Sequence, residues 1–364
     1  MMARPLRENS LSPLTELPHS GMFLEKGTGM VAPVHNADRN PALDFTKGTL
    51  VLFMILYHWI NYFVSTQGSV YAYLRFITPS FIFITGFVIA NVYPVKYGWG
   101  NPRASERLMS RGLKLLALFT LLNITANIMF TSSYKGAMPG IEGFIGSAPS
   151  IYISGNARAS FGVLVPISYL LLLSAGIFLA THLSKYLVHL TCGLLFLCLA
   201  VLNLSDRSST NLEMLAIGLL GMVLGLYPIE KINRWVNHPY AIVYLYIGYT
   251  IAITIWGVTY FLQVIGVCLS VMLIYLTGMK CTAWGRIQRP INLLGEYSLF
   301  GYIAQIGLLQ LLYRGLPHLY LGIRALWVIS FVAAFALTVM TVKMLHWTRT
   351  KSHTVDRLYR ATFS

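Results

Sequence analysis

Long apolar runs separated by short polar stretches follow one another along most of the chain after residue 43. Runs such as 212–227 and 258–278 approach the roughly 20 residues that a helix needs to cross the hydrocarbon core of a membrane. They are too long and too uniformly apolar for the alternating strands of a membrane β-barrel. Because a backbone in lipid must satisfy its own hydrogen bonds, the pattern predicts membrane-spanning helices.

At about 20 residues per span, the pattern predicts an all-α bundle of ten transmembrane helices. Their expected ranges are 44–65, 72–93, 107–130, 160–181, 185–204, 211–228, 239–255, 258–278, 291–313 and 322–346. The boundary at Trp256-Gly257 is the least marked, and one continuous helix there would give nine spans. Residues 1–40 are polar and proline-rich, which predicts a mobile cytoplasmic tail. The bundle is then expected over 41–348 and a basic cytoplasmic tail over 349–364.

The distribution of cations supports ten spans. In that arrangement 21 of the 27 Lys and Arg residues fall on the side of the two termini. The exceptions are Arg75, Lys135, Arg158, Arg207, Arg314 and Arg324. Since cytoplasmic loops are enriched in Lys and Arg, both termini are predicted to face the cytoplasm. A nine-span chain would scatter the cations more evenly.

Composition agrees with an integral membrane protein. The 364 residues are 56% hydrophobic and only 11% charged, and mean hydropathy is +0.63. A soluble domain is about 25% charged, so an ordinary soluble enzyme and a disordered chain are excluded. The net charge of +15 is explained by orientation in the membrane, and we expect no nucleic-acid partner. The four cysteines lack C-x-x-C spacing and are expected to be core side chains, with no metal site.

The first predicted helix carries the most informative polar residues. Lys47 and His58 are eleven residues apart, which is three helical turns plus about 20°, so they share a face about 16 Å apart along the axis. Lys47 then lies at the cytoplasmic boundary and His58 near mid-membrane. Asp44 can hold the ammonium of Lys47 or favour the helix N-terminus, and Asn61 can orient the imidazole. An ionisable residue at membrane depth indicates function, although a histidine that only bonds a neighbouring helix is the alternative.

Further polar residues are candidates for substrate contacts. A basic stripe on the third predicted helix suits the phosphates of a nucleotide-bearing donor, although orientation in the membrane also explains it; it comprises Arg103, Arg107, Arg111 and Lys114. On the outer side, acceptor contacts are expected at Arg75, Asn123, Asn127, Glu213 and Gln305, where helix–helix hydrogen bonding is the alternative for the two asparagines. The glycine-rich loop 131–159 is expected to be a lid, an acceptor platform or a flexible connection.

Three motifs resemble the membrane acyltransferase superfamily, which includes the acyltransferase-3 family, the glucan succinyltransferases and the heparan-α-glucosaminide N-acetyltransferases. They are LDFTKG at 43–48 followed by YHW at 57–59, RFITPSFIFITGFVIA at 75–90, and LLGEYSLFGYIAQ at 293–305. Many members have a basic residue, ten intervening positions and a histidine. Position 47 is Lys where acyltransferase-3 members commonly have Arg, so a point charge replaces a bidentate grip. Position 305 is Gln where some relatives have a second His.

The resemblance implies an enzyme that moves an acyl group, such as acetyl or succinyl, from cytosolic acyl-CoA to a hydroxyl or amine of a glycan or other envelope acceptor. His58 would be the intramembrane general base and Lys47 its basic partner toward the CoA end. Direct transfer is favoured, with an acyl-His intermediate as the variant. Acyl-CoA is expected as co-substrate without a tightly bound cofactor, in a multi-pass protein of the bacterial inner membrane. The oligomeric state is left open, and a proton-coupled transporter or exporter of a polar solute is the alternative function.

Overall fold

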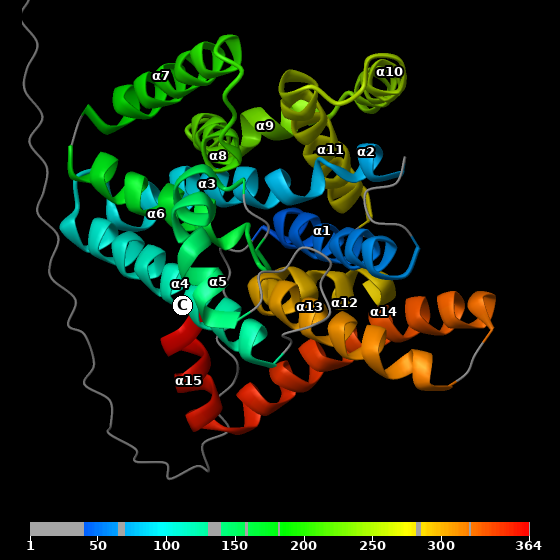
Figure 1. The fold of residues 1–364 in the computed structure, drawn as a ribbon. Coiled ribbons are helices and arrows are strands. Elements are labelled where there is room, and N and C mark those ends of the chain that lie inside the picture. Colours follow the sequence, from blue (N-terminus) through cyan, green and yellow to red (C-terminus); the bar gives the residue numbers. More distant parts are fainter. Residues whose placement is uncertain are drawn as a thin grey trace, which may run out of the picture. The chain divides into compact units, whose positions relative to one another are not determined.

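A computed structural model gives the fold of residues 40–64, 70–129, 140–156, 159–180, 183–281, 285–319 and 322–363. Every regular element in these ranges is a helix, which confirms the predicted all-α class (Figure 1). The elements are α1 (Pro41–Trp59), η1 (Ile60–Val64), α2 (Val70–Leu74), α3 (Ile77–Tyr97), α4 (Pro102–Met129), α5 (Gly140–Pro149), η2 (Ser150–Ser154), α6 (Leu164–Leu179), α7 (Ser184–Leu204), α8 (Thr210–Gly225), α9 (Ile229–Val236), α10 (Pro239–Trp256), α11 (Tyr260–Lys280), α12 (Gly285–Glu296), α13 (Ser298–Gly315), η5 (Leu316–Leu319), α14 (Ile323–Lys351) and α15 (His353–Phe363).

Helix α1 lies in the middle of the bundle and packs against α3, α11, α12, α13 and α14 (Figure 1). Asn40 caps its N-terminus: the side-chain oxygen accepts hydrogen bonds from the backbone N–H of Ala42 and Leu43, a standard way to satisfy the first donors of a helix. Glycine lets its neighbour come close: a Cβ on Gly48 would lie 1.9 Å from the carbonyl oxygen of Ile291 in α12. The backbones of α1 and α12 are therefore in contact close to the middle of α1.

Each of the ten predicted ranges contains a helix in the structure, but the count of ten spans is not confirmed. By length and apolar composition, six helices of the described chain could cross a membrane, or seven if the bent pair α8 and α9 forms one span. Helices α10 and α11 are separate, because the chain turns at Gly257, where φ is +72°. The break predicted at Trp256-Gly257 is therefore confirmed.

Three predicted helices are interrupted. The first changes from α to π geometry at η1, directly after His58 and Trp59, and such π segments are frequent at functional sites. The second breaks between Leu74 and Ile77 because Pro79 has no N–H to donate to the carbonyl of Arg75. The side chain of Gln263 donates to that carbonyl instead, at 3.2 Å.

The ninth predicted helix, expected as one segment over 291–313, is two helices that meet at Tyr297. The Tyr297 hydroxyl accepts a hydrogen bond from Arg349 at 2.9 Å and lies 3.0 Å from Nδ1 of His346. These contacts with α14 fix Tyr297, the residue between α12 and α13. The sequence range alone could not predict them, because both partners come from a distant part of the chain.

The segment predicted as a loop over 131–159 is largely helical where the structure describes it, as α5 and η2. Residues 130–139, with Gly136, and residues 157–158 lie outside the described ranges. Gly155 ends η2 with φ +72°, and a Cβ there would lie 2.6 Å from Oδ1 of Asn211. Glycine is needed at this position for both its backbone conformation and the close approach of α8.

The C-terminal segment predicted as a basic tail is helical and packed, whereas residues 1–39 lie outside the described ranges. Helix α14 continues to Lys351 and is followed by α15. Asp356 of α15 forms ion pairs with Arg349 at 2.6 Å and with Arg360 at 2.7 Å. The Arg349 guanidinium also lies over the ring of Tyr359, 4.0 Å from its centroid.

A pH-dependent stability is predicted for this contact. Hydrogen bonds from Arg349 hold the pKa of the Asp356 carboxyl below its usual range, so the stabilisation is present above about pH 4, the unfolded-state pKa, and is lost as pH falls through the lower folded-state pKa. We expect Asp356→Asn to lower the unfolding temperature in detergent by a few degrees at pH 7 and by less at pH 3, where part of the stabilisation has been lost. The control is Asp206→Asn, at an exposed turn position. A loss that is equal at both pH values would contradict the ionic origin.

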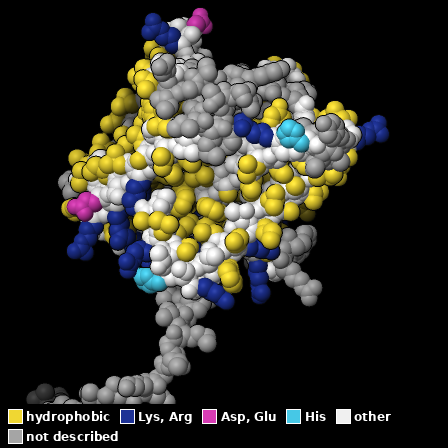
Figure 2. Space-filling model, turned by 60° about the horizontal axis from the view of Figure 1, so that its bottom comes forward, with side chains coloured by type: hydrophobic (Ala, Val, Ile, Leu, Met, Phe, Trp, Pro, Cys, Tyr) yellow, Lys and Arg dark blue, Asp and Glu magenta, His cyan; other side chains and the backbone are white. Residues whose placement is uncertain are grey.

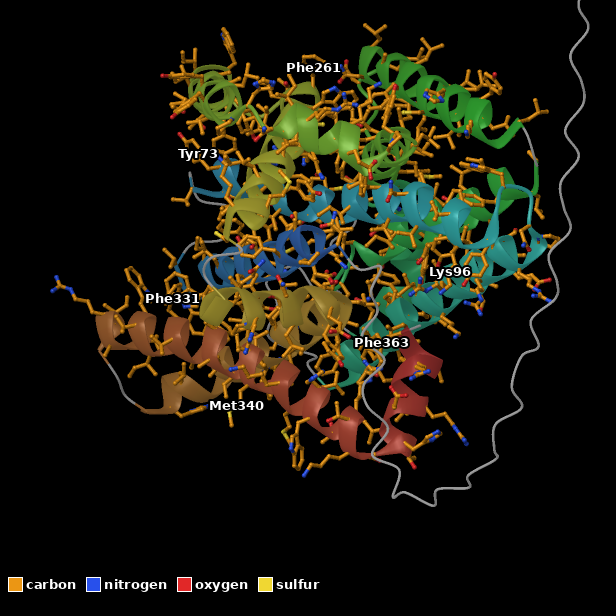
Figure 3. The ribbon with its side chains drawn as sticks, turned by 180° about the vertical axis from the view of Figure 1, so that it is seen from behind. Tyr73, Lys96, Phe261, Phe331, Met340 and Phe363 are labelled. Carbon is orange, nitrogen blue, oxygen red and sulfur yellow. The ribbon has the colours of Figure 1, made fainter. Side chains whose placement is uncertain are left out.

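Large apolar side chains cover the outside of the bundle. Phe261 is 72% exposed and Met340 67% exposed, and both point away from the helices (Figure 3). Figure 2 shows a broad band of hydrophobic side chains on one face, with several Lys and Arg side chains along its lower edge. An apolar surface of this extent is stable only against another apolar medium, as in a protein embedded in lipid.

Candidate active site

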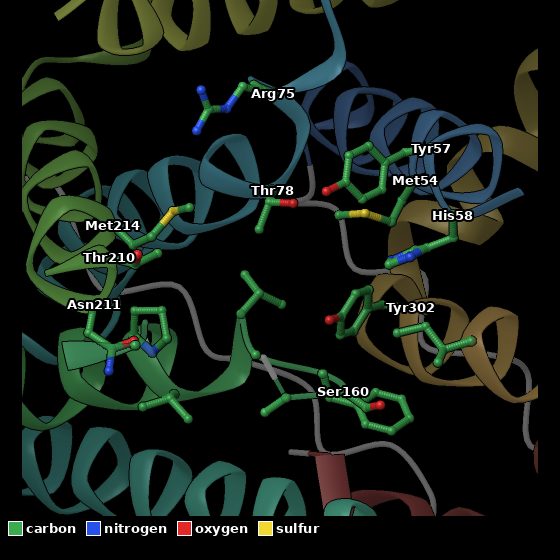
Figure 4. A pocket seen from close by; sticks show the side chains of 18 of the residues that line it. Met54, Tyr57, His58, Arg75, Thr78, Ser160, Thr210, Asn211, Met214 and Tyr302 are labelled. Carbon is green, nitrogen blue, oxygen red and sulfur yellow. The ribbon is translucent and has the colours of Figure 1, made fainter. Parts of the chain in front are cut away.

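A cavity of about 460 Å³ lies at the C-terminal end of α1 (Figure 4). Four parts of the chain build it: the end of α1 with η1, the α2–α3 break, the segment from η2 to the start of α6, and the first turns of α8, with α11 and α13 closing the sides. Its lining residues include Met54, Tyr57, His58, Tyr62, Tyr71, Arg75, Thr78, Asn156, Ser160, Phe161, Thr210, Asn211, Glu213, Met214, Gln263, Tyr302 and Ile306. The volume is that of a typical small-molecule site.

His58 stands on one wall of the cavity together with two tyrosines. The ring of Tyr57 meets the imidazole edge-on with the centroids 5.1 Å apart. The Tyr302 ring lies 6.5 Å from it. Thr210, Asn211 and Met214 form the opposite wall in Figure 4. The imidazole therefore faces an open, mixed polar and aromatic space in which a second molecule can reach it.

Charged and amide side chains also line the cavity. Arg75 and Glu213 both line it, and Nη1 of Arg75 lies 3.5 Å from the carbonyl oxygen of Val258. Gln263 also lines it and fixes the backbone of Arg75. A cation, a carboxylate and an amide next to one another can hold a polar molecule in several orientations.

Hydrogen bonds fix the wall opposite His58. The Asn211 amide donates to the carbonyls of Ile151 at 2.9 Å and Tyr152 at 3.0 Å, and Asn156 donates to the carbonyl of Ser208 at 3.0 Å. Asn123, 3% exposed, donates to the carbonyl of Ser160 at 2.9 Å. The predicted acceptor residue Asn123 thus supports the wall from behind and does not line the cavity.

Lys47 lies at the other end of α1 and pairs with Asp44 at 2.6 Å. Since α1 is continuous from Pro41 to Trp59, Lys47 and His58 share a helical face about 16 Å apart, as predicted. Lys47 is not among the cavity residues. Between these two ends of α1, the side chains of Leu50, Val51 and Met54 are buried.

The basic stripe lies on α4, which packs mainly against α6 rather than against α1. Arg111 donates to the Tyr93 hydroxyl at 2.7 Å, Arg107 donates to the Tyr97 hydroxyl, and Arg103 is exposed. Lys114, one turn further along α4, is half-buried. The structure therefore brings the stripe together with tyrosines of α3 and not with Lys47.

Two further predicted residues, Asn61 and Gln305, are not among the described residues that line the cavity. Gln305 is fully buried, and neither polar atom of its amide has a hydrogen-bond partner among the described residues. Asn61 lies in the π-helical segment η1, where the change of helical register removes the simple three-residue relation to His58. The side chain of Asn127 lies outside the part of the chain that is described.

Several cavity residues were not identified from the sequence. Tyr71, Gln263 and Tyr302 come from three different helices and carry no spacing signal that relates them to His58. Tyr302 stands inside the motif at 293–305, so the motif pointed to its helix but not to its hydroxyl. Among the described residues no group of three His, Cys, Asp or Glu side chains could hold a metal ion.

A comparison with protein families assigns the chain. A family model described as an acyltransferase domain matches residues 40–343, which is nearly the whole bundle. The chain belongs to the acyltransferase-3 family. No curated protein and no solved structure matches it. This acyltransferase is an integral, multi-pass membrane protein, because the family domain coincides with the run of long apolar helices.

Proposed function

We propose that the acyltransferase moves an acyl group from cytosolic acyl-CoA to a hydroxyl or amine of an acceptor that enters the outer cavity, with His58 as the general base. The observation that carries this proposal is the place of His58: it lines a 460 Å³ cavity on the same helix that carries the Lys47–Asp44 ion pair at its opposite end. Transfer of an acyl group across the membrane requires a base that the donor can reach from one side and the acceptor from the other.

The neutral imidazole of His58 suits proton transfer at this depth. It accepts the proton of the attacking hydroxyl or amine and then gives this proton to the leaving sulfur. The imidazole is neutral before and after the reaction, so no charge has to be buried in the resting protein. Direct transfer needs only one such base when both substrates are bound together. The cavity gives the acceptor that room beside the imidazole.

The donor is expected to approach from the Lys47 end. The ammonium of Lys47, and beyond it the cations of α4, can attract the phosphates of coenzyme A. Lys47 and His58 are about 16 Å apart along the helix axis. The pantetheine arm spans this distance and carries the thioester to the imidazole. Acetyl and succinyl groups are the donors to test first.

The acceptor is expected to be a glycan or another polar envelope molecule. Aromatic side chains, Tyr57, Phe161 and Tyr302 among them, line the cavity together with Arg75, Glu213 and Gln263. Apolar ring faces together with charged and amide groups suit the apolar and hydroxylated faces of a sugar. A bacterial inner membrane, with the envelope on the cavity side, is the location that fits this arrangement.

The proposal is tested by release of free thiol from acetyl-CoA and succinyl-CoA with the purified protein, with glycan acceptors added and omitted. Acceptor-dependent thiol release and labelled product are expected. The alternative, a proton-coupled transporter, predicts pH-dependent uptake into proteoliposomes without acyl-CoA. Uptake of that kind combined with no thiol release would overturn the enzymatic proposal.

A Lys47 variant tests the donor side. We expect Lys47→Gln to raise the KM for acyl-CoA by about tenfold, the value of one lost ionic contact of about 1.4 kcal/mol, with little change in kcat, and Lys47→Arg to retain a low KM. The double variant D44N/K47Q separates donor binding from the loss of the Asp44 partner. If the double variant restores the KM, Lys47 serves only to neutralise Asp44.

A further inference from the structure

Tyr302 is held rigidly beside His58. Its side chain is 6% exposed and its ring lies against Phe161 at 6.2 Å and Phe81 at 6.4 Å between centroids. The Phe161 contact is edge-to-face, a preferred geometry for aromatic pairs. The ring is thus fixed from two other parts of the chain while Tyr302 itself lines the cavity.

The hydroxyl of Tyr302 points into the cavity on the same wall as the imidazole of His58 (Figure 4). The ring centroids are 6.5 Å apart and the planes are inclined by 47°, so the two rings are not stacked. Two side chains that converge in this way can contact different atoms of one small group.

The second tyrosine on this wall is used differently. The Tyr57 hydroxyl donates to the Tyr71 hydroxyl at 2.8 Å, which ties α1 and α2 together. Its ring supports the imidazole edge-on at 5.1 Å. Tyr57 therefore shapes the wall, whereas the hydroxyl of Tyr302 faces the cavity beside the imidazole (Figure 4).

We propose that the Tyr302 hydroxyl donates a hydrogen bond to the thioester carbonyl oxygen and stabilises the negative charge that develops there during acyl transfer. This inference rests on the proposed function and adds a second catalytic residue to it. A preorganised donor in a site of low dielectric stabilises the transition state more than the ground state. The rings of Phe81 and Phe161 provide both the preorganisation and the low dielectric.

The electrons and protons of the step balance. The acceptor oxygen attacks the thioester carbon and forms a C–O bond while a ring nitrogen of His58 takes the hydroxyl proton. The carbonyl π electrons move onto oxygen, and this oxyanion accepts the hydrogen bond from Tyr302, which keeps its own proton. When the carbonyl re-forms, the C–S bond breaks and the coenzyme A sulfur leaves with the proton from His58.

The test is the rate of transfer by Tyr302→Phe, which removes one oxygen and keeps the ring that packs on Phe81 and Phe161. We expect kcat to fall about 100-fold, as for the loss of one oxyanion donor, with the KM for both substrates within threefold of wild type and an unchanged unfolding temperature. The matched control is Tyr313→Phe on the same helix, outside the cavity lining, which is expected to keep wild-type kcat.

A second probe is 3-fluorotyrosine incorporated at position 302, which keeps the shape of the ring but makes the phenol more acidic. Because a phenolate cannot donate, we expect the alkaline fall of kcat to move to lower pH, which a purely structural role would not produce. Wild-type kcat in Tyr302→Phe, or a loss in Tyr57→Phe alone, would overturn the assignment to Tyr302. If His58→Ala abolishes transfer while Tyr302→Phe does not, the proposed function stands and only this inference fails; if wild type shows no transfer, both fail.

Discussion

His58→Ala is expected to lower the rate of acyl transfer by about 10²–10⁴-fold, the range contributed by a positioned general base. The reason is geometric: His58 lines the cavity, and the variant removes the group that accepts the acceptor proton. Thiol release and product formation measure the loss, and thermal shift with acyl-CoA measures donor binding. Binding is expected to persist, since the Lys47 end of α1 is unchanged.

The matched control is His189→Ala. His189 is an exposed histidine of α7 whose Nδ1 lies 2.9 Å from the carbonyl oxygen of Lys185, away from the cavity lining. It is expected to retain wild-type turnover. Full turnover in His58→Ala would remove the general base from the proposed mechanism, whatever the outcome for the donor and acceptor.

Gly48→Val is expected to prevent stable assembly of the bundle. A Cβ at Gly48 would lie 1.9 Å from the carbonyl oxygen of Ile291, and one at Gly295 would lie 1.8 Å from that of Asp44. Backbone atoms cannot move aside as a flexible side chain can, so α1 and α12 must separate and leave their interface unfilled. Low yield of monodisperse protein in detergent, or a large fall in unfolding temperature, measures the effect.

Gly193→Val is the control for this prediction. Gly193 lies in α7, and nothing is within 4 Å of a Cβ built there, so the same change is expected to keep yield and unfolding temperature near wild type. If Gly48→Val were as stable as the control, the contact between α1 and α12 would not be needed for the fold.

The helices were predictable because their signal is local. Each apolar run in the predicted ranges contains a helix. The spacing of Lys47 and His58 could be converted directly into a shared helical face, since α1 is regular over both residues. The three motifs also led to the correct family.

The break at Tyr297, the helices within 131–159 and the packed C-terminal helix were missed for a common reason. Each depends on partners far away in the chain, such as Arg349 for Tyr297 and Asn211 for the end of η2. The same limit applies to the site: Arg75 and Glu213 were named as candidates and line the cavity, whereas Asn123 and Gln305 had equally polar sequence contexts and do not.

The sequence by itself determined the all-α class, the approximate helix ranges, the family and the central importance of α1. These follow from helical periodicity and from residue types within single segments. Only the tertiary structure decided which side chains share the cavity with His58, because α1, η2, α8, α11 and α13 meet there through packing. The register of that packing is fixed by close glycine contacts and by hydrogen bonds between distant segments, and no periodicity within one helix can encode it.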